Sequence, residues 1–192
     1  TIELCEEIIK EKLNITYLIE THLNNLDDKM MKLLYKSGLK MVYVGIESSS
    51  AAVLKDINRF TIENDKQYNL IKNLEDYGIA VKSMFMFGNP DDNERTIKDT
   101  IKYARNLPNL FSQFSIFTPY PGTPIYEKYK NIITENKLEN FNQYKLTYSH
   151  KNFTVKKIEK LKNFAYLRFY LDLKKIFKIL KFFVISKYDL KT

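Results

Sequence analysis

The chain has 192 residues, of which 44% are hydrophobic and 28% are charged, and this balance excludes a disordered or linker-rich protein. Its net charge of +8 and pI of about 9.3 admit nucleic acid or an anionic membrane surface as partners. A single cysteine, Cys5, excludes an internal disulfide framework and fits a cytoplasmic location. With two histidines, it also leaves too few soft ligands for a zinc or iron–sulfur site made by these residues alone.

The first 30 residues predict a helix, a strand and the start of a second helix. Residues 2–12 have the spacing of an amphipathic helix, with Cys5 on its apolar side as a small core residue. Residues 15–21 are rich in strand formers and predict a strand. Asn24 or Asn25 is expected to cap the helix that follows.

The next strand ends in a carboxylate. Residues 41–46 form a short apolar run rich in β-branched residues, which predicts a strand buried on both faces, and Glu47 follows it directly. A carboxylate in such a place needs a partner or water, and ligands of parallel α/β proteins bind at the carboxyl ends of strands. Glu47 is therefore the first candidate functional residue.

Two further strands complete the pattern in the first 130 residues. Residues 79–87 predict a third strand, which a Gly-Asn-Pro turn ends. Residues 111–118 predict a fourth strand, which a proline-rich run follows. Strands that are separated by single helices predict right-handed crossovers and a parallel sheet, so the fold class is α/β. Periodicity leaves open whether the sheet is doubly wound or an arc of a (β/α) barrel. The predicted helix starts in this region are Ser50, Thr61, Asn93 and Thr123.

Three segments at these strand ends resemble a known family. They are GIESSSAAVLKDINR at 45–59, FMFGNPDDNERTI at 85–97 and QFSIFTPYPGTPIYE at 113–127. In this order and spacing they resemble radical S-adenosylmethionine (SAM) enzymes, above all the branch whose longer members carry an amino-terminal cobalamin-binding domain. The resemblance covers about residues 1–170.

The resemblance implies a partial (β/α) barrel of the radical SAM type, followed by a helical basic tail. The predicted domains are a barrel core over 1–130, whose four strands correspond to the third to sixth of the family, and a carboxyl-terminal helical extension over 131–192. The implied cofactors are SAM, a [4Fe-4S] cluster held by a C-x-x-x-C-x-x-C loop, and cobalamin in the parent enzyme of some relatives. That loop would lie before Thr1, so the chain is expected to be the carboxyl-terminal part of the core.

The resemblance also assigns cofactor-binding roles at the strand ends. Glu47 matches the position that meets SAM, commonly at its ribose hydroxyls, and Arg59 matches a basic position that pairs with the SAM carboxylate. The Gly-x-Pro turn flanks the adenine, and the end of the fourth strand reads its edge through backbone groups. The predicted site residues are Glu47, Ser48, Arg59, Gly88, Pro90, Phe117 and Thr118; no catalytic residue and no metal ligand is assigned.

Each assignment has a structural alternative. Glu47 could cap the following helix, and Arg59 could be a solvated residue at a helix end. The buried phenylalanines of the third and fourth strands are expected to be core residues, with Phe117 as the one serious ligand contact. Three departures from the family pattern are Ser49 in place of glycine, Asp91-Asp92 in place of Gly-Glu, and His22 in place of arginine.

The implied parent reaction is reductive cleavage of SAM to a 5′-deoxyadenosyl radical, followed by hydrogen abstraction from a small-molecule substrate or by methyl transfer. One alternative is a non-catalytic fragment or split-enzyme subunit, which binds a polypeptide carrying the cluster loop and the other barrel strands. A tRNA-modifying radical SAM enzyme is ranked below it, because the basic residues show no base-reading pattern. Upstream DNA with an in-frame cysteine motif would separate these hypotheses.

The tail from residue 152 predicts one or two basic amphipathic helices. Ile158, Leu161 and Ala165 share one face, and a second apolar face is expected to join Phe169 to Leu173 and the residues after it. The first half is predicted to pack against the barrel. For the second half, packing and docking on a membrane surface both stay open.

Overall fold

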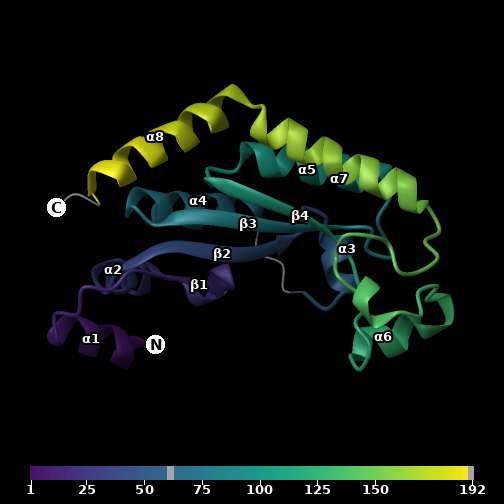
Figure 1. Cartoon of the computed structure of the whole chain (residues 1–192), viewed down its shortest axis with the longest axis horizontal. Coiled ribbons are helices and arrows are strands. Elements are labelled where there is room, and N and C mark those ends of the chain that lie inside the picture. Colours follow the sequence, from purple (N-terminus) through teal and green to yellow (C-terminus); the bar gives the residue numbers. More distant parts are fainter. Residues whose placement is uncertain (60–62, 190–192) are drawn as a thin grey trace.

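A four-stranded parallel sheet is the centre of the computed structural model, which describes residues 1–59 and 63–189 (Figure 1). The strands are β1 (Tyr17–Thr21), β2 (Leu39–Glu47), β3 (Ala80–Phe87) and β4 (Phe111–Ile116). Each pairs in parallel with its neighbour, and the spatial order β1-β2-β3-β4 is the order in sequence. Doubly wound sheets reverse their strand order, so the uniform order selects the arc of a (β/α) barrel.

Helices connect the strands and extend the chain beyond them. Signals close to each helix start explain where several of them begin. The side chains of Ser50, Asn93 and Thr123 accept hydrogen bonds from backbone N–H groups in the first turns of α3, α5 and α6, as predicted. The helices are α1 (Ile2–Lys10), α2 (Asp28–Lys36), α3 (Ala51–Asp56), α4 (Asn64–Asp76), α5 (Glu94–Asn106), α6 (Pro124–Tyr129), α7 (Val155–Tyr170) and α8 (Leu173–Asp189), with single 3-10 turns η1 (Leu23–Asn25), η2 (Lys130–Ile132) and η3 (Leu138–Asn140).

One predicted cap is wrong. Asn24 and Asn25 lie in η1, and the cap of α2 is Asp27, whose carboxylate accepts a hydrogen bond from the backbone N–H of Met30 at 2.7 Å. The chain uses the asparagines for a 3-10 turn first, so the helix begins later than the sequence pattern indicates. Predicted cap Thr61 lies outside the described residues.

The core lies between the sheet and the helices that pack on one of its faces. Val42, Val44 and Phe85 point to this side and are fully buried, and Cys5 is a buried core residue as predicted. The side chains that alternate with them on the opposite face, among them Tyr43, are half-buried. The sheet therefore has a closed face toward the helices and a more open face on the inside of the arc.

The outer edge of β4 is covered by tyrosine hydroxyls from α7. The hydroxyl of Tyr166 accepts from the backbone N–H of Phe114 and donates to its carbonyl, both at 3.1 Å. Tyr170, one turn later, does the same with Ser112, at 3.2 and 2.8 Å. Two side chains thus satisfy backbone groups that a neighbouring strand would otherwise pair with.

The basic tail forms two helices that follow one another along one side of the sheet (Figure 1). α7 buries Ile158, Ala165 and Phe169 completely, so packing of the first half is confirmed. The predicted continuous apolar face is wrong, because the helix is interrupted between α7 and α8, and Leu173 is 70% exposed where Phe169 is buried. No helix in the described parts of the chain is long and apolar enough to cross a membrane. The division of the chain at residue 130 stays a prediction.

Candidate cofactor-binding site

Glu47 stands at the carboxyl end of β2, in an unusual backbone conformation. The pairing of β2 with β3 shifts register between Gly45 and Glu47, and Glu47 has φ +64°. A left-handed conformation costs a residue with a side chain about 1 kcal/mol, so it is kept only where the surroundings require it. Strained residues of this kind are frequent at ligand sites, which adds to the interest of this position.

The carboxylate of Glu47 is held by a short chain of polar side chains. Arg59 Nη2 donates to Glu47 Oε1 at 2.9 Å, and Arg59 Nη1 lies 3.0 Å from Nε2 of His22. The side chain of Glu47 is 10% exposed and that of Arg59 is 39% exposed. A Cβ on Gly45 would lie 2.8 Å from Glu47 Oε1, so the glycine leaves room for the carboxylate. Residues that follow β1, end β2 and follow α3 therefore meet at the Glu47 carboxylate, and the SAM-binding roles of Glu47 and Arg59 stay predictions.

Burial dominates the electrostatics of this carboxylate. Loss of solvent raises the pKa of Glu47 above its ordinary value, and the positive charge of Arg59 acts against that rise. The carboxylate of Glu20 adds a smaller upward effect on the same pKa. The group is thus a poorly solvated acceptor whose charge is balanced by one guanidinium.

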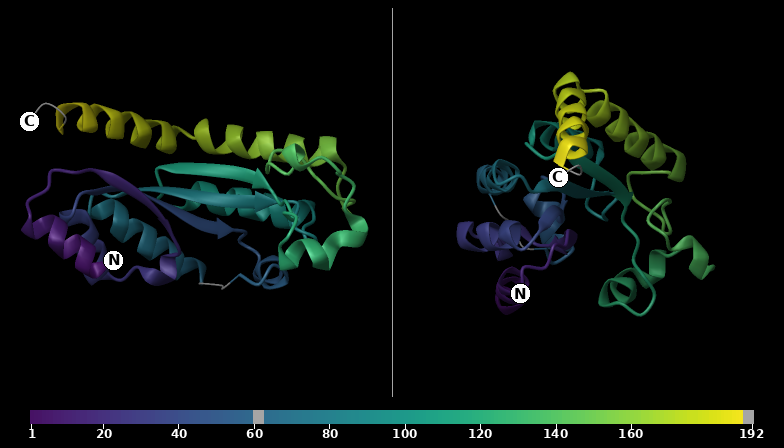
Figure 2. Two further views of the ribbon diagram at one scale, coloured as in Figure 1. Left: turned by 60° about the horizontal axis from the view of Figure 1, so that its bottom comes forward. Right: turned by 60° about the vertical axis from the view of Figure 1, so that its left-hand side comes forward.

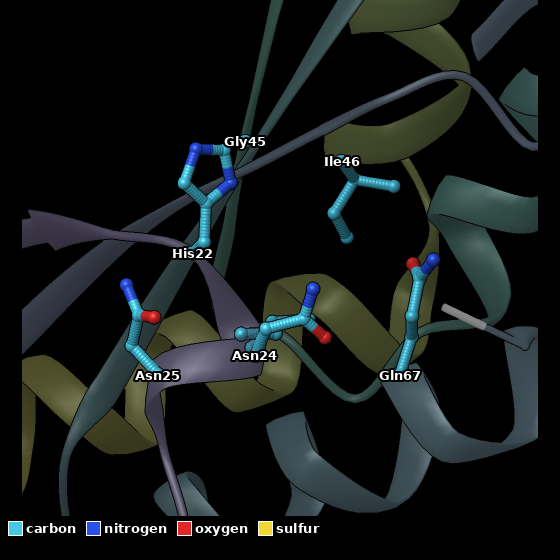
Figure 3. Close-up of a pocket in the computed structure, with 7 residues that line it drawn as sticks. His22, Asn24, Asn25, Gly45, Ile46 and Gln67 are labelled. Atoms are coloured by element: carbon cyan, nitrogen blue, oxygen red, sulfur yellow. The ribbon is translucent and has the colours of Figure 1, made fainter. Parts of the chain in front are cut away.

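A cavity of about 340 Å³ adjoins the pair, between the ends of β1 and β2 and the start of α4. Figure 3 shows the side chains of His22, Asn24, Ile46 and Gln67 around one opening. His22, which contacts Arg59, is part of its wall, as is Gly45 beside the Glu47 carboxylate. This size and its mixture of amide, imidazole and apolar groups suit part of a small ligand.

A second group of predicted residues lies at the end of β3. Gly88 has φ +76°, which glycine adopts without strain, and its carbonyl accepts a hydrogen bond from the hydroxyl of Tyr148. The neighbouring carbonyl of Asn89 lies 2.8 Å from His150 Nε2. The backbone N–H of Asn152 is 2.9 Å from the other ring nitrogen of His150, so that nitrogen accepts and Nε2 donates.

The acidic turn after Gly88 is built without a left-handed aspartate. Asp91 is not among the described residues with positive φ, so the turn accommodates an aspartate without left-handed strain. Asp92 is buried and accepts hydrogen bonds from the backbone N–H of Asn89 at 2.9 Å and from the hydroxyl of Thr96 at 2.7 Å. Asp92 thus serves the turn and the start of α5, whereas Asp91 is exposed and forms an ion pair with Lys151 at 2.9 Å.

The other predicted site residues are placed close to these two groups, and several of their side chains already have partners. The Ser48 hydroxyl accepts from the backbone N–H of Ser50 at 3.1 Å and lies 3.3 Å from the hydroxyl of Thr100. Phe117 is buried against the rings of Tyr129 and Tyr148. The Thr118 hydroxyl donates to the carbonyl of Ile116 at 3.1 Å, and Pro90 is half-buried. Of the seven predicted site residues, Glu47 and Arg59 contact each other directly through their side chains.

Sequence reasoning missed the residues that support this site. His22 stood out only as a departure from the family pattern, and nothing local connects it with Arg59, 37 residues later. Tyr148 and His150 lie about 60 residues after the turn that they bind, in a stretch without regular periodicity. The one signal available in the sequence was His150 itself, a histidine in a polar segment without regular periodicity.

The described residues do not offer a site for the family's iron–sulfur cluster. Cys5 is buried in α1, 3.8 Å from the hydroxyl of Tyr17, and a single thiol cannot supply a three-cysteine ligand set. Across residues 1–59 and 63–184, whose side chains the structure describes, no group of three His, Cys, Asp or Glu side chains is placed to hold a metal ion. The polar residues present fit a SAM-type ligand, with carboxylate, guanidinium and cavity together, and they do not fit the cluster.

Comparisons with known proteins identify the family of the chain. The model of the radical SAM superfamily matches residues 1–104. An uncharacterized methyltransferase of Pyrococcus horikoshii is 32% identical over 182 residues, covering 92% of this chain and 39% of that protein. An anaerobic magnesium-protoporphyrin IX monomethyl ester cyclase of Rubrivivax gelatinosus is 29% identical over 73% of this chain and 26% of its own length. The chain thus spans well under half the length of these relatives.

The fold has a counterpart among solved structures. The radical SAM methyltransferase TsrM from Kitasatospora setae, solved with cobalamin and a [4Fe-4S] cluster bound, superposes with a TM-score of 0.61 at 18% identity. The match covers 67% of this chain and 27% of TsrM, and it concerns the fold alone. Since the family model covers more than half of its residues, this chain belongs to the radical SAM superfamily.

Proposed function

We propose that this chain supplies part of the SAM-binding face of a radical SAM enzyme whose reaction is a methyl transfer or a related radical reaction. The observation that carries the proposal is the buried Glu47 carboxylate, paired with Arg59 at 2.9 Å beside a cavity of about 340 Å³. A bound SAM molecule and a [4Fe-4S] cluster supply the radical or methyl-group chemistry of the family. The chain's own residues bind and orient SAM and keep water away from it.

Glu47 and Arg59 have complementary tasks in this proposal. A carboxylate accepts hydrogen bonds from ribose hydroxyls, and a guanidinium binds a carboxylate in a bidentate manner. The two groups proposed to bind SAM, Glu47 and Arg59, thus already contact each other. When SAM binds, each exchanges this contact for a hydrogen bond to the ligand. Arg59 is free to turn, since its side chain is 39% exposed, while Glu47 is held in its place by the strained backbone.

The turn at the end of β3 is the natural support for the adenine. Gly88 and Pro90 are proposed to flank the base, and the backbone of Phe117 and Thr118 to face its edge. The Phe117 backbone N–H donates to the carbonyl of Phe87 at 2.8 Å, which fixes the two strand ends relative to one another. Tyr148 and His150 hold the carbonyls of Gly88 and Asn89, so this side of the site is rigid before any ligand arrives.

Methyl transfer is favoured by the similar proteins. The Pyrococcus horikoshii relative and TsrM are both named methyltransferases, and TsrM was solved with cobalamin. The Rubrivivax gelatinosus relative is a cyclase, so ring formation is the second outcome for the parent enzyme. Cobalamin use and the small-molecule substrate belong to the whole enzyme and are proposals at the level of the family.

Nuclear magnetic resonance titration of the ¹⁵N-labelled chain with SAM tests the site directly. We expect saturable shifts of the backbone signals of Gly45, Glu47 and Arg59, with a dissociation constant of about 1 mM or tighter. Glu47→Gln and Arg59→Lys should each weaken binding about tenfold, because each removes one charged hydrogen bond.

The control variants are Glu127→Gln and Arg95→Lys, whose side chains are 61% and 91% exposed and lie away from the cavity. They should bind SAM as the unchanged chain does. Shifts that are absent, or that are equally large in Glu47→Gln and Arg59→Lys, would contradict the proposed site.

A second candidate is a subunit of a split enzyme, and one observation favours it. Leu18 on β1 is 56% exposed, and the nearby Leu4 and Leu13 are 66% and 54% exposed, so the β1 side of the sheet carries apolar surface that another polypeptide could cover. Native mass spectrometry of the chain isolated from its own cells is the test. A stoichiometric partner that carries a C-x-x-x-C-x-x-C motif supports this candidate, and the chain alone or within one longer polypeptide contradicts it.

A further inference from the structure

Helix α8 is attached to the molecule through its lysines. The Lys175 ammonium is buried and donates to the carbonyls of Leu107 and Asn109, at 2.6 and 2.9 Å. Lys178 forms an ion pair with Glu75 at 3.0 Å and also binds the carbonyl of Pro108. These contacts orient the helix, because both lysines must face the loop that leads into β4.

The orientation turns the apolar side of α8 outward. Leu173, Phe177, Leu180 and Val184 recur at helical spacing and are 70%, 69%, 56% and 56% exposed. An ordinary surface helix buries such a stripe and exposes its lysines. Here the inner side holds the buried Lys175 together with half-buried Ile179 and Phe182, and the exposed side holds leucine and phenylalanine beside lysines, so a second apolar stripe is left facing outward.

The exposed stripe continues onto α7. Leu167 in the last turn of α7 is 57% exposed, and Leu171, which directly follows the helix, is 68% exposed. Figure 2 shows α7 and α8 following one another as a single long edge of the molecule. We call this surface the apolar ridge and define it as Leu167, Leu171, Leu173, Phe177, Leu180 and Val184.

Positive charge surrounds the ridge. Residues 151–192 hold 12 Lys and Arg against 3 Asp and Glu, whereas residues 1–150 hold 19 against 20. The whole excess charge of the chain is therefore in the segment that carries the ridge. Lys174 and Lys181 are exposed on α8, and Arg168 is exposed on α7.

We propose that the apolar ridge docks on an anionic lipid surface, with α8 lying in the plane of the interface. Aliphatic and aromatic side chains would enter the boundary between headgroups and acyl chains, and the lysines beside them would meet lipid phosphates. A second copy of the chain fits less well, because two such segments would bring their positive charges together. Docking in this way requires no membrane-spanning helix.

Vesicle flotation of the full chain tests the proposal. We expect the protein to float with vesicles of equal parts phosphatidylglycerol and phosphatidylcholine about tenfold more than with phosphatidylcholine alone, and to detach at high salt. Phe177→Ser/Leu180→Ser should lower the partition about tenfold or more, because two apolar side chains no longer enter the interface. Lys174→Glu/Lys181→Glu should act similarly through charge.

Matched controls separate specific docking from general stickiness and charge. Leu138→Ser removes a leucine that is 74% exposed in η3, and Lys32→Glu/Lys36→Glu makes the same charge change on α2. Both should keep most of the binding, and circular dichroism should show each variant folded. The proposal is overturned if the unchanged chain does not float, if Phe177→Ser/Leu180→Ser floats equally well, or if that variant instead dissolves a dimer detected by sedimentation.

Discussion

Two glutamates at opposite ends of the sheet, Glu75 and Glu47, have side chains that are 14% and 10% exposed, and they differ in how many hydrogen bonds their carboxylates accept. At the amino end, Glu75 Oε1 accepts from the backbone N–H groups of Val81 and Leu110, each at 3.0 Å, and Oε2 pairs with Lys178. At the carboxyl end, Arg59 is the one hydrogen-bond partner of the Glu47 carboxylate among the described residues, and it reaches Oε1. Burial raises the pKa of both groups.

The difference separates a structural carboxylate from a candidate ligand-binding one. Glu75 ties α4, β3 and the loop before β4 together, and every one of its tasks is internal. Glu47 keeps acceptor capacity, sits in a strained conformation and lies beside a cavity wall. A burial value or a pKa direction alone would not distinguish the two, whereas counting hydrogen-bond partners does.

The largest expected effect is on stability, at the amino end. Glu75→Ala removes the acceptor of the Val81 backbone N–H and the ion-pair partner of Lys178, whereas the Leu110 N–H keeps the Val81 carbonyl and Lys178 keeps the Pro108 carbonyl, so we expect a loss of about 2 kcal/mol in the free energy of unfolding. Glu47→Ala should lose less than about 1 kcal/mol, because alanine leaves the backbone strain at residue 47 unchanged and the guanidinium that loses its partner is 39% exposed and still contacts His22. Urea unfolding measures both, and equal losses would remove the contrast.

A smaller effect is expected from crowding the Glu47 carboxylate. Gly45→Ala places a Cβ against Oε1, and the side chain must move away from its present contact with Arg59. Since the φ of Gly45 is not in the left-handed region, alanine fits the backbone, and stability should change by less than about 1 kcal/mol. SAM binding in the titration should weaken about fivefold. Unchanged affinity would indicate that the carboxylate does not contact the ligand.

The pH dependence of Glu47 should be weaker still. Its folded-state pKa is raised, so the folded protein takes up this proton at higher pH than the unfolded chain does. Above its folded-state pKa, the ionised Glu47 carboxylate therefore lowers the free energy of unfolding. This loss of stability disappears as the pH falls through that pKa. Relative to Glu47→Gln, the unchanged chain should gain stability as the pH falls from neutral toward the ordinary carboxyl pKa of 4.5, as measured by urea unfolding. A gain on raising the pH would contradict the assigned direction.

The smallest expected effect concerns Glu94, an exposed carboxylate whose pKa is lowered and not raised. Ion pairs with Lys157 and Lys98 lower the pKa of Glu94 to about 2, so its stabilising contribution is present above the ordinary value near 4.5 and is lost as the pH falls toward 2. Glu94→Gln should make the acid limb of the stability curve slightly less steep. Thermal unfolding across that range provides the measurement, and an identical acid limb would show that these surface pairs contribute nothing.

Much of the fold could be predicted because its signals are local. The β-branched run before Glu47, the caps Ser50, Asn93 and Thr123, and the glycine after β3 all act within a few residues of themselves. The position of Glu47 at the end of β2 was likewise predictable, while its role in binding SAM stays a proposal. The contacts that complete the site depend on residues far apart in sequence, and no periodicity reports them.

Two features show what local patterns cannot supply. The positive φ of Glu47 follows from a register shift between β2 and β3, which depends on how two strands meet. The outward apolar face of α8 depends on Lys175 reaching two carbonyls of a distant loop. A helical wheel of α8 would place its leucines inside and its lysines outside.

The tyrosine pair on α7 has a consequence for the solubility of the protein. The unpaired backbone groups of an edge strand can pair with the edge strand of another molecule. Repetition of this pairing gives cross-β fibrils. The hydroxyls of Tyr166 and Tyr170 each bind the backbone N–H and C=O of one residue of β4. The two phenol oxygens therefore take the place that a fifth strand would occupy. With α7 in place, this border of the sheet is closed to intermolecular growth.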